Sequence, residues 1–285
     1  MNKKLLALYG LKWNPFSPEL PIEALRLTPA LEDFAWRIEH NLAREGGFAL
    51  ITGDVGTGKS VALRLLAERL APLPDLTVAA LAHPSANLAD FYPQLGDLFA
   101  VDLRPHNRWM GFKALRNRWL AHLDSTLLRP VLLIDEAQRV QPAVLCELRL
   151  LASSGFDSRV LLTVVLAGDR RLSELLRHEE LLPLGSRIRA RLALEYAARD
   201  ELLDLLKHLT RSAGNASLMT PELMRTLADH AMGNYRALTN MAAELLAVAA
   251  QRELTQLDEK LYLDVFAPPN PAASKRRERG RTPEH

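Results

Sequence analysis

Residues 53–60 read GDVGTGKS, a spacing of glycines, lysine and serine that is typical of a phosphate-binding loop. The glycines allow backbone N–H groups to close around phosphate oxygens, and the helix that follows adds the positive end of its dipole. Lys59 can reach the β- and γ-phosphates of a nucleotide, and the Ser60 hydroxyl can bind Mg²⁺. We therefore predict a site for ATP and Mg²⁺ made by Gly53, Asp54, Val55, Gly56, Thr57, Gly58, Lys59 and Ser60.

A pair of carboxylates follows the apolar run VLLI at residues 131–134. Asp135 is suited to bind Mg²⁺, directly or through water, and Glu136 to orient and deprotonate an attacking water. The alternative is an Asp-Glu pair that only caps a helix. Together with the phosphate-binding loop, the pair predicts an Mg²⁺-dependent ATPase that releases ADP and phosphate.

Two further residues are candidates for sensing the nucleotide. Asp169 follows the apolar run 161–167 and could position the water, although a simple turn residue is the alternative. Arg236 lies in GNYRALTN, at the start of a helix in the second domain. It could contact the γ-phosphate of ATP, and the alternative is an ordinary surface arginine.

Residues 185–194 read GSRIRARLAL, and the three arginines of this cluster come just before the last predicted strand. At that edge of the domain an arginine is remote from its own phosphate-binding loop but could serve the ATP of a neighbouring subunit. We favour Arg187 for this role, followed by Arg191 and then Arg189. The contact would build a ring or a helical filament. The alternative is a solvated basic turn.

The elements that position these residues are short apolar runs alternating with helical patterns. The runs are FALIT (48–52), LTVAALA (76–82), VLLID (131–135), LLTVVLA (161–167) and LALE (192–195). Nearly continuous apolar strands separated by helices indicate a parallel sheet covered on both faces. After Tyr196 the pattern is helical only. The predicted fold class is α/β, a parallel five-stranded sheet followed by a small all-helical domain.

These patterns divide the chain into an α/β domain over 1–195, a helical domain over 196–266 and a basic tail over 267–285. The tail is rich in proline and charge, so we expect it to be disordered. Net charge is +2, and the tail holds five basic against two acidic residues. Any nucleic-acid site on the nearly neutral body must therefore be a local patch.

The composition excludes several classes of protein. One cysteine in 285 residues excludes an internal disulfide framework and a Cys-based zinc cluster. The N-terminal apolar run is too short and wrongly flanked for a signal peptide, and no run reaches the roughly 18 apolar residues of a membrane helix. We expect a cytoplasmic protein without a membrane contact.

With these motifs the chain resembles AAA+ ATPases over nearly its whole length, and two groups in particular. The opening YGLKWNPF, the loop GDVGTGKS, IDEAQ and GNYRALTN resemble secretion ATPases of the ExeA/GspA type. LLIDEAQRVQP and LAGDRRLSELLRHEELLPLGSRIRARL resemble transposition ATPases of the TnsC/TniB type. Secretion members continue into a membrane span and a peptidoglycan-binding region that we do not find here, so we favour the transposition type.

The transposition resemblance implies ATP-dependent oligomers around double-stranded DNA that select a target and recruit transposase. The matching DNA-contacting stretches are HPSANL (83–88), which contains Asn87, and RPHNRW (104–109). The second stretch opens a segment that has five basic residues and no acid before Asp124. Side chains and free N–H groups at a helix start can both bind phosphates. The candidate contacts are Arg104, His106, Asn107 and Arg108; a solvated basic helix is the alternative.

We therefore predict a DNA-binding AAA+ ATPase that regulates transposition, with transposase and target-selection proteins as its partners. A cytoplasmic ATPase of a secretion or envelope-assembly system is the second interpretation. A nucleotide switch that binds protein partners without hydrolysis is the third, and the presence of Glu136 argues against it.

Overall fold

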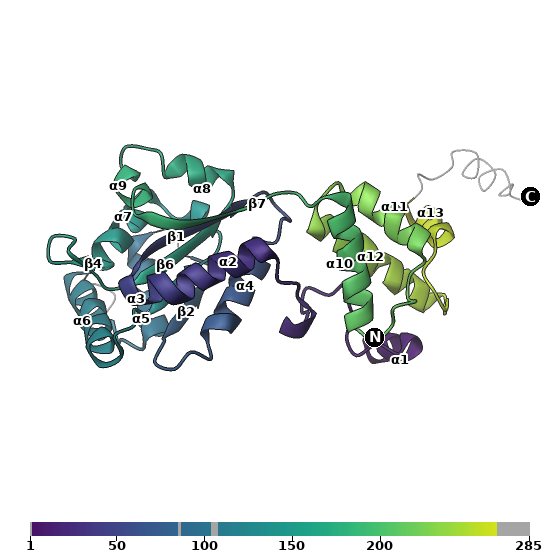
Figure 1. Ribbon diagram of the computed structural model, residues 1–285, viewed down its shortest axis with the longest axis horizontal. Helices are drawn as coiled ribbons and strands as arrows, with labels where there is room; N and C mark the ends of the chain where they lie inside the picture. Colours follow the sequence, from purple (N-terminus) through teal and green to yellow (C-terminus); the bar gives the residue numbers. More distant parts are fainter. Residues whose placement is uncertain (1, 85–86, 104–107, 267–285) are drawn as a thin grey trace, which may run out of the picture. The chain divides into compact units, whose positions relative to one another are not determined.

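The computed structural model describes residues 2–84, 87–103 and 108–266 of the chain (Figure 1). They fold into two compact units. The α/β unit is Leu25–Tyr196, and the helical unit combines the described parts of Met1–Ala24 and Ala197–His285. The predicted basic tail, 267–285, lies outside the described residues.

The α/β unit is built on a parallel sheet of five strands in the order β2-β3-β6-β1-β7. The strands are β1 (Gly47–Gly53), β2 (Val78–Leu81), β3 (Val131–Ile134), β6 (Thr163–Gly168) and β7 (Ile188–Leu194). Every residue of β3 and β6 is buried, as expected for strands covered on both faces. The predicted five-stranded parallel sheet is confirmed.

Helices cover both faces of this sheet (Figure 1). One face packs against α5 (Leu88–Phe99), α6 (Arg108–Thr126) and α7 (Pro142–Leu151). The other packs against α2 (Pro29–Arg37) and α4 (Lys59–Leu70). Successive residues of each central strand point to opposite faces, so one strand contributes to both cores. The shorter elements of this unit are η2 (Ile38–Leu42), α3 (Ala43–Glu45), η3 (Ala137–Arg139), β4 (Ser153–Ser154), β5 (Arg159–Val160), α8 (Arg170–Leu175) and α9 (Leu182–Gly185).

Strand β7 begins four residues before the predicted LALE strand and includes part of the arginine cluster. Ala190 and Leu192 are buried, whereas Arg189 and Arg191 point outward. This alternation is typical of a strand with one buried face, and β7 is an edge strand. The alternating arginines therefore belong to the strand, apart from Arg187, which precedes it.

The helical unit contains α10 (Arg199–Ser212), α11 (Pro221–Ala231), α12 (Tyr235–Gln251) and α13 (Glu259–Phe266), in agreement with the helical pattern predicted after Tyr196. The α11 helix starts at a side-chain cap, because the Thr220 hydroxyl accepts a hydrogen bond from the backbone N–H of Leu223. At the other end Met232 and Gly233 both adopt left-handed backbone angles, which end the helix.

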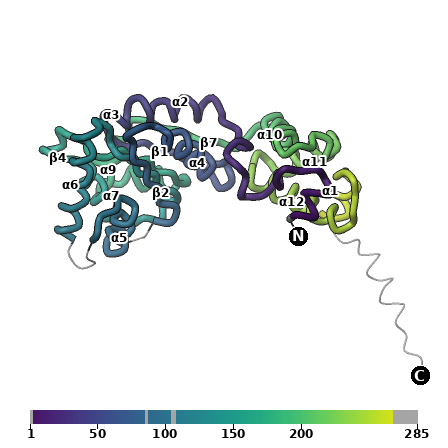
Figure 2. Tube along the Cα trace, turned by 90° about the horizontal axis from the view of Figure 1, so that it is seen from below, coloured from purple at the N-terminus to yellow at the C-terminus, as the bar shows by residue number. Residues whose placement is uncertain are grey.

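The N-terminal segment belongs to the helical unit, which corrects the predicted domain 1–195. Helix α1 (Asn2–Tyr9) lies beside α12 (Figure 2), and η1 (Ile22–Ala24) packs against α10. Two hydrogen bonds hold this segment in place: the backbone N–H of Lys12 donates to the Ala213 carbonyl at 2.8 Å, and the side-chain amide of Asn215 donates to the Tyr9 carbonyl at 3.0 Å. The prediction grouped this segment with the strands that are nearest in sequence. Its apolar residues are instead buried against helices some 200 positions later.

Candidate nucleotide site

The phosphate-binding loop joins β1 to α4 at the carboxyl end of the sheet. Gly56 and Gly58 have φ angles of 84° and 98°, which a residue with a Cβ rarely adopts. Gly53 is required for a second reason. A Cβ there would lie 2.5 Å from the Thr57 hydroxyl and 2.6 Å from the Leu194 carbonyl oxygen. The glycines thus allow the loop to turn tightly against the end of β7.

Lys59, the first residue of α4, points back into this loop. Its ammonium group donates to the carbonyls of Gly53 and Asp54, both at 2.9 Å. The side chain is buried, and the Thr57 hydroxyl also donates to the Asp54 carbonyl. A cation held inside a ring of backbone groups at a helix start is the arrangement that binds phosphates.

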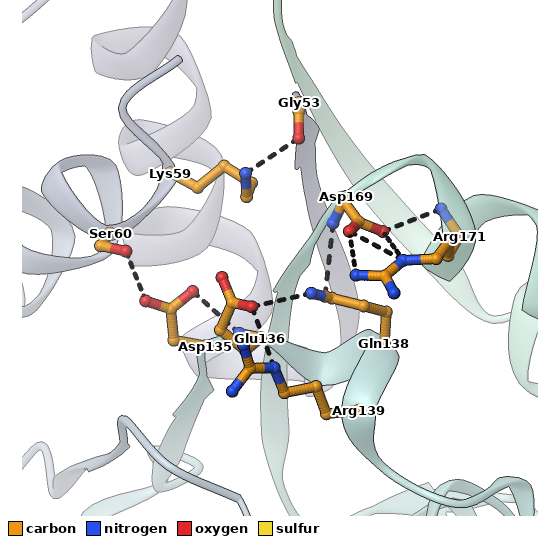
Figure 3. Close-up of polar contacts among 9 residues, drawn as sticks. All are labelled: Gly53, Lys59, Ser60, Asp135, Glu136, Gln138, Arg139, Asp169 and Arg171. Atoms are coloured by element: carbon orange, nitrogen blue, oxygen red, sulfur yellow. Dashed lines mark hydrogen bonds and ion pairs between the residues drawn. The ribbon is translucent and has the colours of Figure 1, made fainter. Parts of the chain in front are cut away.

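The structure brings Ser60 and Asp135 together across 75 positions of sequence (Figure 3). The Ser60 hydroxyl donates to Asp135 Oδ2 at 2.6 Å, and Asp135 Oδ1 accepts from the Glu136 N–H at 2.9 Å. Within the described ranges no three His, Cys, Asp or Glu side chains gather into a metal cage. One hydroxyl and one carboxylate fit Mg²⁺, which takes most of its ligands from phosphates and water.

Glu136 is held in an unusual backbone conformation at the end of β3. Its φ of 50° and ψ of 36° are left-handed, a strained state for a residue with a side chain that is often found at functional sites. Its Oε2 accepts from the Gln138 amide at 2.9 Å and lies 3.4 Å from Arg139 Nε (Figure 3). The catalytic candidate therefore stands beside Asp135 with a fixed side chain.

Asp169 lies at the end of β6, the strand between β3 and β1. Both of its carboxylate oxygens accept from the Arg171 guanidinium, and Oδ1 also caps α8 by accepting from the Arg171 N–H. The side-chain bonds from Arg171 hold the pKa of Asp169 below its usual value. The position agrees with the predicted water-positioning role, which stays a prediction.

Two basic residues of this site escaped the sequence reasoning. Arg170 donates to the Asp54 carboxylate at 2.6 Å and so ties the start of α8 to the phosphate-binding loop. The two residues are 116 positions apart, and no local pattern announces their contact. Arg139, which lies beside Glu136, follows directly after IDEAQ and could have been considered from its position alone.

Residues 42–176 match the AAA domain family. The α/β unit is a P-loop domain of the AAA+ fold. The chain is 31% identical over 246 residues to the general secretion pathway protein A of Aeromonas hydrophila, an alignment that covers 85% of this chain and 44% of that protein. It thus spans less than half the length of this relative, and the resemblance to the ExeA/GspA type is confirmed.

Solved AAA+ structures share the fold at low sequence identity. Cdc6p from Pyrobaculum aerophilum superposes with a TM-score of 0.68 and 17% identity, over 85% of this chain and 67% of that chain. The Drosophila ORC structure bound to DNA gives 0.66 and 16%, over 93% and 66%. At this identity the likeness shows the fold alone. In the part of the chain that the structure describes, no helix has the length and hydrophobicity to cross a membrane.

Two arginines of the predicted cluster in this AAA+ domain have acidic partners. Arg187 pairs with Asp157, which follows β4, and also donates to the Pro183 carbonyl. The Asp157 pKa is lowered by hydrogen bonds from Ser153 and Arg187. Arg189 pairs with Glu45 and packs over Gly47, so it stabilises the start of β1.

Arg191 differs from its two neighbours. It reaches the Gly185 carbonyl at 3.4 Å and forms no ion pair with a described residue. The three arginines therefore have three different surroundings: two form ion pairs, each with its own acidic partner, and one donates to a backbone carbonyl. The role of Arg187 toward a neighbouring subunit stays a prediction, and so does the nucleotide contact of Arg236, which belongs to the helical unit.

The predicted DNA contacts are only partly within the described residues. Arg104, His106 and Asn107 lie outside them. Asn87 caps α5, with its side chain accepting from the Asp90 N–H at 3.0 Å. Arg108 forms a two-point ion pair with Glu147 of α7. Asn87 and Arg108 thus each have a structural role, and DNA contact by either residue stays a prediction.

Glu147 is a buried carboxylate that joins three helices of the AAA+ domain. It accepts from Arg108 of α6 and from the Tyr92 hydroxyl of α5. Burial alone raises the pKa of Glu147, but the bonds from Arg108 and Tyr92 outweigh it and the pKa is lowered. Burial and the Glu147 contact raise the pKa of Tyr92. The charged carboxylate therefore fixes the start of α6.

We expect Glu147→Ala to lower the free energy of unfolding by about 1–3 kcal/mol, because the Tyr92 hydroxyl is left buried without an acceptor. Arg108 contributes less, since its side chain is 62% exposed and can be hydrated. Urea unfolding measures the loss, and Tyr92→Phe in the same chain should recover part of it. A change below about 0.5 kcal/mol, the usual range for surface substitutions, would contradict this account.

Proposed function

We propose that this AAA+ protein binds ATP with Mg²⁺ and hydrolyses it to ADP and phosphate. The observation that carries the proposal is the contact of Ser60 with Asp135 beside the loop that encloses Lys59. These groups would hold a triphosphate at one edge of the sheet, with Glu136 next to it. Mg²⁺, when bound by Ser60 and Asp135, would neutralise charge on the β- and γ-phosphates.

In the proposed reaction Glu136 takes one proton from a water molecule. The water oxygen forms a bond to the γ-phosphorus while the bond from that phosphorus to the bridging oxygen of ADP breaks. Lys59 would exchange its bonds to the Gly53 and Asp54 carbonyls for bonds to phosphate oxygens. The residues at the carboxyl end of the sheet, here called the phosphate edge, suffice for these steps. The one further requirement is a cation that stabilises charge on the transferred phosphoryl group.

We infer that this cation comes from a second subunit. Arg187 precedes Ile188, which pairs with Phe48, whereas the phosphate-binding loop follows Gly53. Six residues of extended strand span about 20 Å, so Arg187 stands at the wrong end of the sheet for its own ATP. A head-to-tail contact would bring it to a neighbour's site and would propagate into a ring or a helical filament.

Double-stranded DNA is the partner that we propose, and regulation of transposition the process. The support is the basic character of α6, where Lys113, Arg116 and Arg118 follow Arg108 before the first acid. The likeness to the LLIDEAQRVQP and LAGDRR stretches of transposition ATPases supports transposase and target-selection proteins as partners.

Replacing Arg104 and Lys113 by alanine tests the DNA contact, and it leaves the Arg108–Glu147 pair intact. We expect weaker binding to every duplex sequence. The slope of log binding constant against log salt concentration should fall in magnitude by about one for each lost phosphate contact. Fluorescence anisotropy at several salt concentrations measures both. Arg26→Ala with Lys260→Ala removes the same charge from exposed positions elsewhere and should leave the slope unchanged. Equal slopes in both double variants would refute a DNA site formed by the 104–109 stretch and α6.

A secretion or envelope-assembly ATPase is the second candidate, favoured by the 31% identity to general secretion pathway protein A. It shares the ATPase chemistry and differs in its partner. A chain of this second type would hydrolyse ATP at a rate unaffected by DNA. A DNA-stimulated rate would favour the first candidate.

A further inference from the structure

The side chain of Gln138 bridges two strand ends at the phosphate edge (Figure 3). Its Nε2 group donates to Glu136 Oε2 at 2.9 Å, and its Oε1 accepts from the backbone N–H of Asp169 at 3.3 Å. Glu136 follows β3, whereas Asp169 follows β6. One amide therefore connects the candidate base to the neighbouring strand.

The end of β6 is shaped to admit this amide. Gly168 is buried, and a Cβ at that position would lie 2.6 Å from Gln138 Oε1. The carboxylate of Asp169 is engaged elsewhere, because Arg171 donates to both of its oxygens. The partner of Gln138 is thus a backbone group, which the sheet holds in place.

The bridge also gives the two carboxylate oxygens of Glu136 different surroundings. Oε2 receives the Gln138 amide and lies near Arg139, whereas Oε1 receives no bond from a described residue. Figure 3 shows this second oxygen without a dashed line. A carboxylate held by one oxygen keeps the other available to accept the proton of a water molecule.

We propose that Gln138 is a positioning residue for ATP hydrolysis. It fixes the rotation of the Glu136 carboxylate relative to the end of β6, so that Oε1 faces the attacking water. A neutral amide suits this task, because it orients the carboxylate without placing a second charge against it. The inference rests on the proposed hydrolysis and adds a residue that acts through Glu136.

Two substitutions distinguish the bond that Gln138 donates to Glu136 from the bond that it accepts from the Asp169 N–H. Gln138→Met keeps an unbranched side chain of similar length and removes both bonds. Gln138→Glu keeps an acceptor for the Asp169 N–H but has no donor for Glu136. We expect both to lower kcat about tenfold to a hundredfold, the cost of misplacing a catalytic group by about 1 Å, with KM and the Kd for ATP within about twofold of wild type.

A matched control is Gln141→Met, the same chemical change on an exposed residue three positions later. It should leave kcat unchanged. If Gln138 only supported β6, Gln138→Glu would keep the wild-type kcat, and that result would overturn the proposal. Unfolding of Gln138→Met would not remove the test, because Gln138→Glu preserves the size of the side chain and its bond to the backbone.

Combining Gln138→Met with Glu136→Gln asks whether Gln138 acts through the base. Single-turnover cleavage of labelled ATP gives the small residual rate. We expect the second substitution to change that rate less than about twofold, since no carboxylate remains to be oriented. A further drop equal to that in the single variant would show that Gln138 acts elsewhere, and would overturn the proposal.

Hydrogen exchange of the Asp169 amide provides a readout that needs no turnover. Protection should fall in Gln138→Met and remain in Gln138→Glu, because only the first loses the acceptor. Protection unchanged in Gln138→Met would overturn the bridge itself. A wild-type protein that shows the expected exchange but no ATP cleavage would instead overturn the proposed hydrolysis, so the two failures are distinguishable.

Discussion

Glu136→Gln will bind ATP as tightly as the wild-type protein and hydrolyse it about 10²–10⁴-fold more slowly, the usual contribution of a positioned base. The amide keeps the size and left-handed backbone of the residue but cannot accept the water proton. Titration with a fluorescent ATP analogue measures the affinity, and release of inorganic phosphate measures the turnover.

Two controls frame this result. Lys59→Ala should lose nucleotide binding, because its ammonium group lies at the centre of the phosphate-binding loop. Glu68→Gln makes the same chemical change on an exposed turn of α4 and should leave both binding and turnover unaltered. Undiminished turnover in Glu136→Gln would remove it as the base. A wild-type protein that binds ATP but does not cleave it would favour the non-hydrolysing switch.

Mixing two inactive variants should restore part of the ATPase activity. Alone, Arg187→Ala is expected to bind ATP normally and to hydrolyse it about 10³–10⁵-fold more slowly, the range observed for arginines supplied to a neighbour's nucleotide. Lys59→Ala lacks a functional loop but supplies an intact Arg187. In a mixed assembly the Lys59→Ala subunit would complete the site of the Arg187→Ala subunit.

The measurement is phosphate release as the ratio of the two variants is varied, with co-assembly followed by light scattering. Arg211→Ala removes an exposed arginine of the helical unit and should behave as wild type. Co-assembled variants that show no recovery would rule out Arg187 as the residue that acts between subunits. Arg191 would then be the next candidate, because it has no acidic partner among the described residues.

The sequence by itself was sufficient for the phosphate-binding loop, the Asp135–Glu136 pair and the five strands. These features are local: the glycine spacing dictates a tight loop, and nearly continuous apolar runs dictate strands buried on both faces. The helices of the second unit were predictable for the same reason, since a cap such as Thr220 acts on the backbone three residues away.

Only the tertiary structure could decide which distant groups meet. Asp54 and Arg170 are brought together by the adjacency of β1 and β6 in the sheet. Arg187 meets Asp157 because β4 and α9 both pack against α7. Residues 2–24 joined the helical unit although they precede the first strand. The free energy gained by burying apolar surface depends on the area removed from water and not on how far apart the residues are in the sequence. The Gln138 bridge required both kinds of information: Glu136 is two positions away, but the Asp169 N–H became its partner only when β3 and β6 paired.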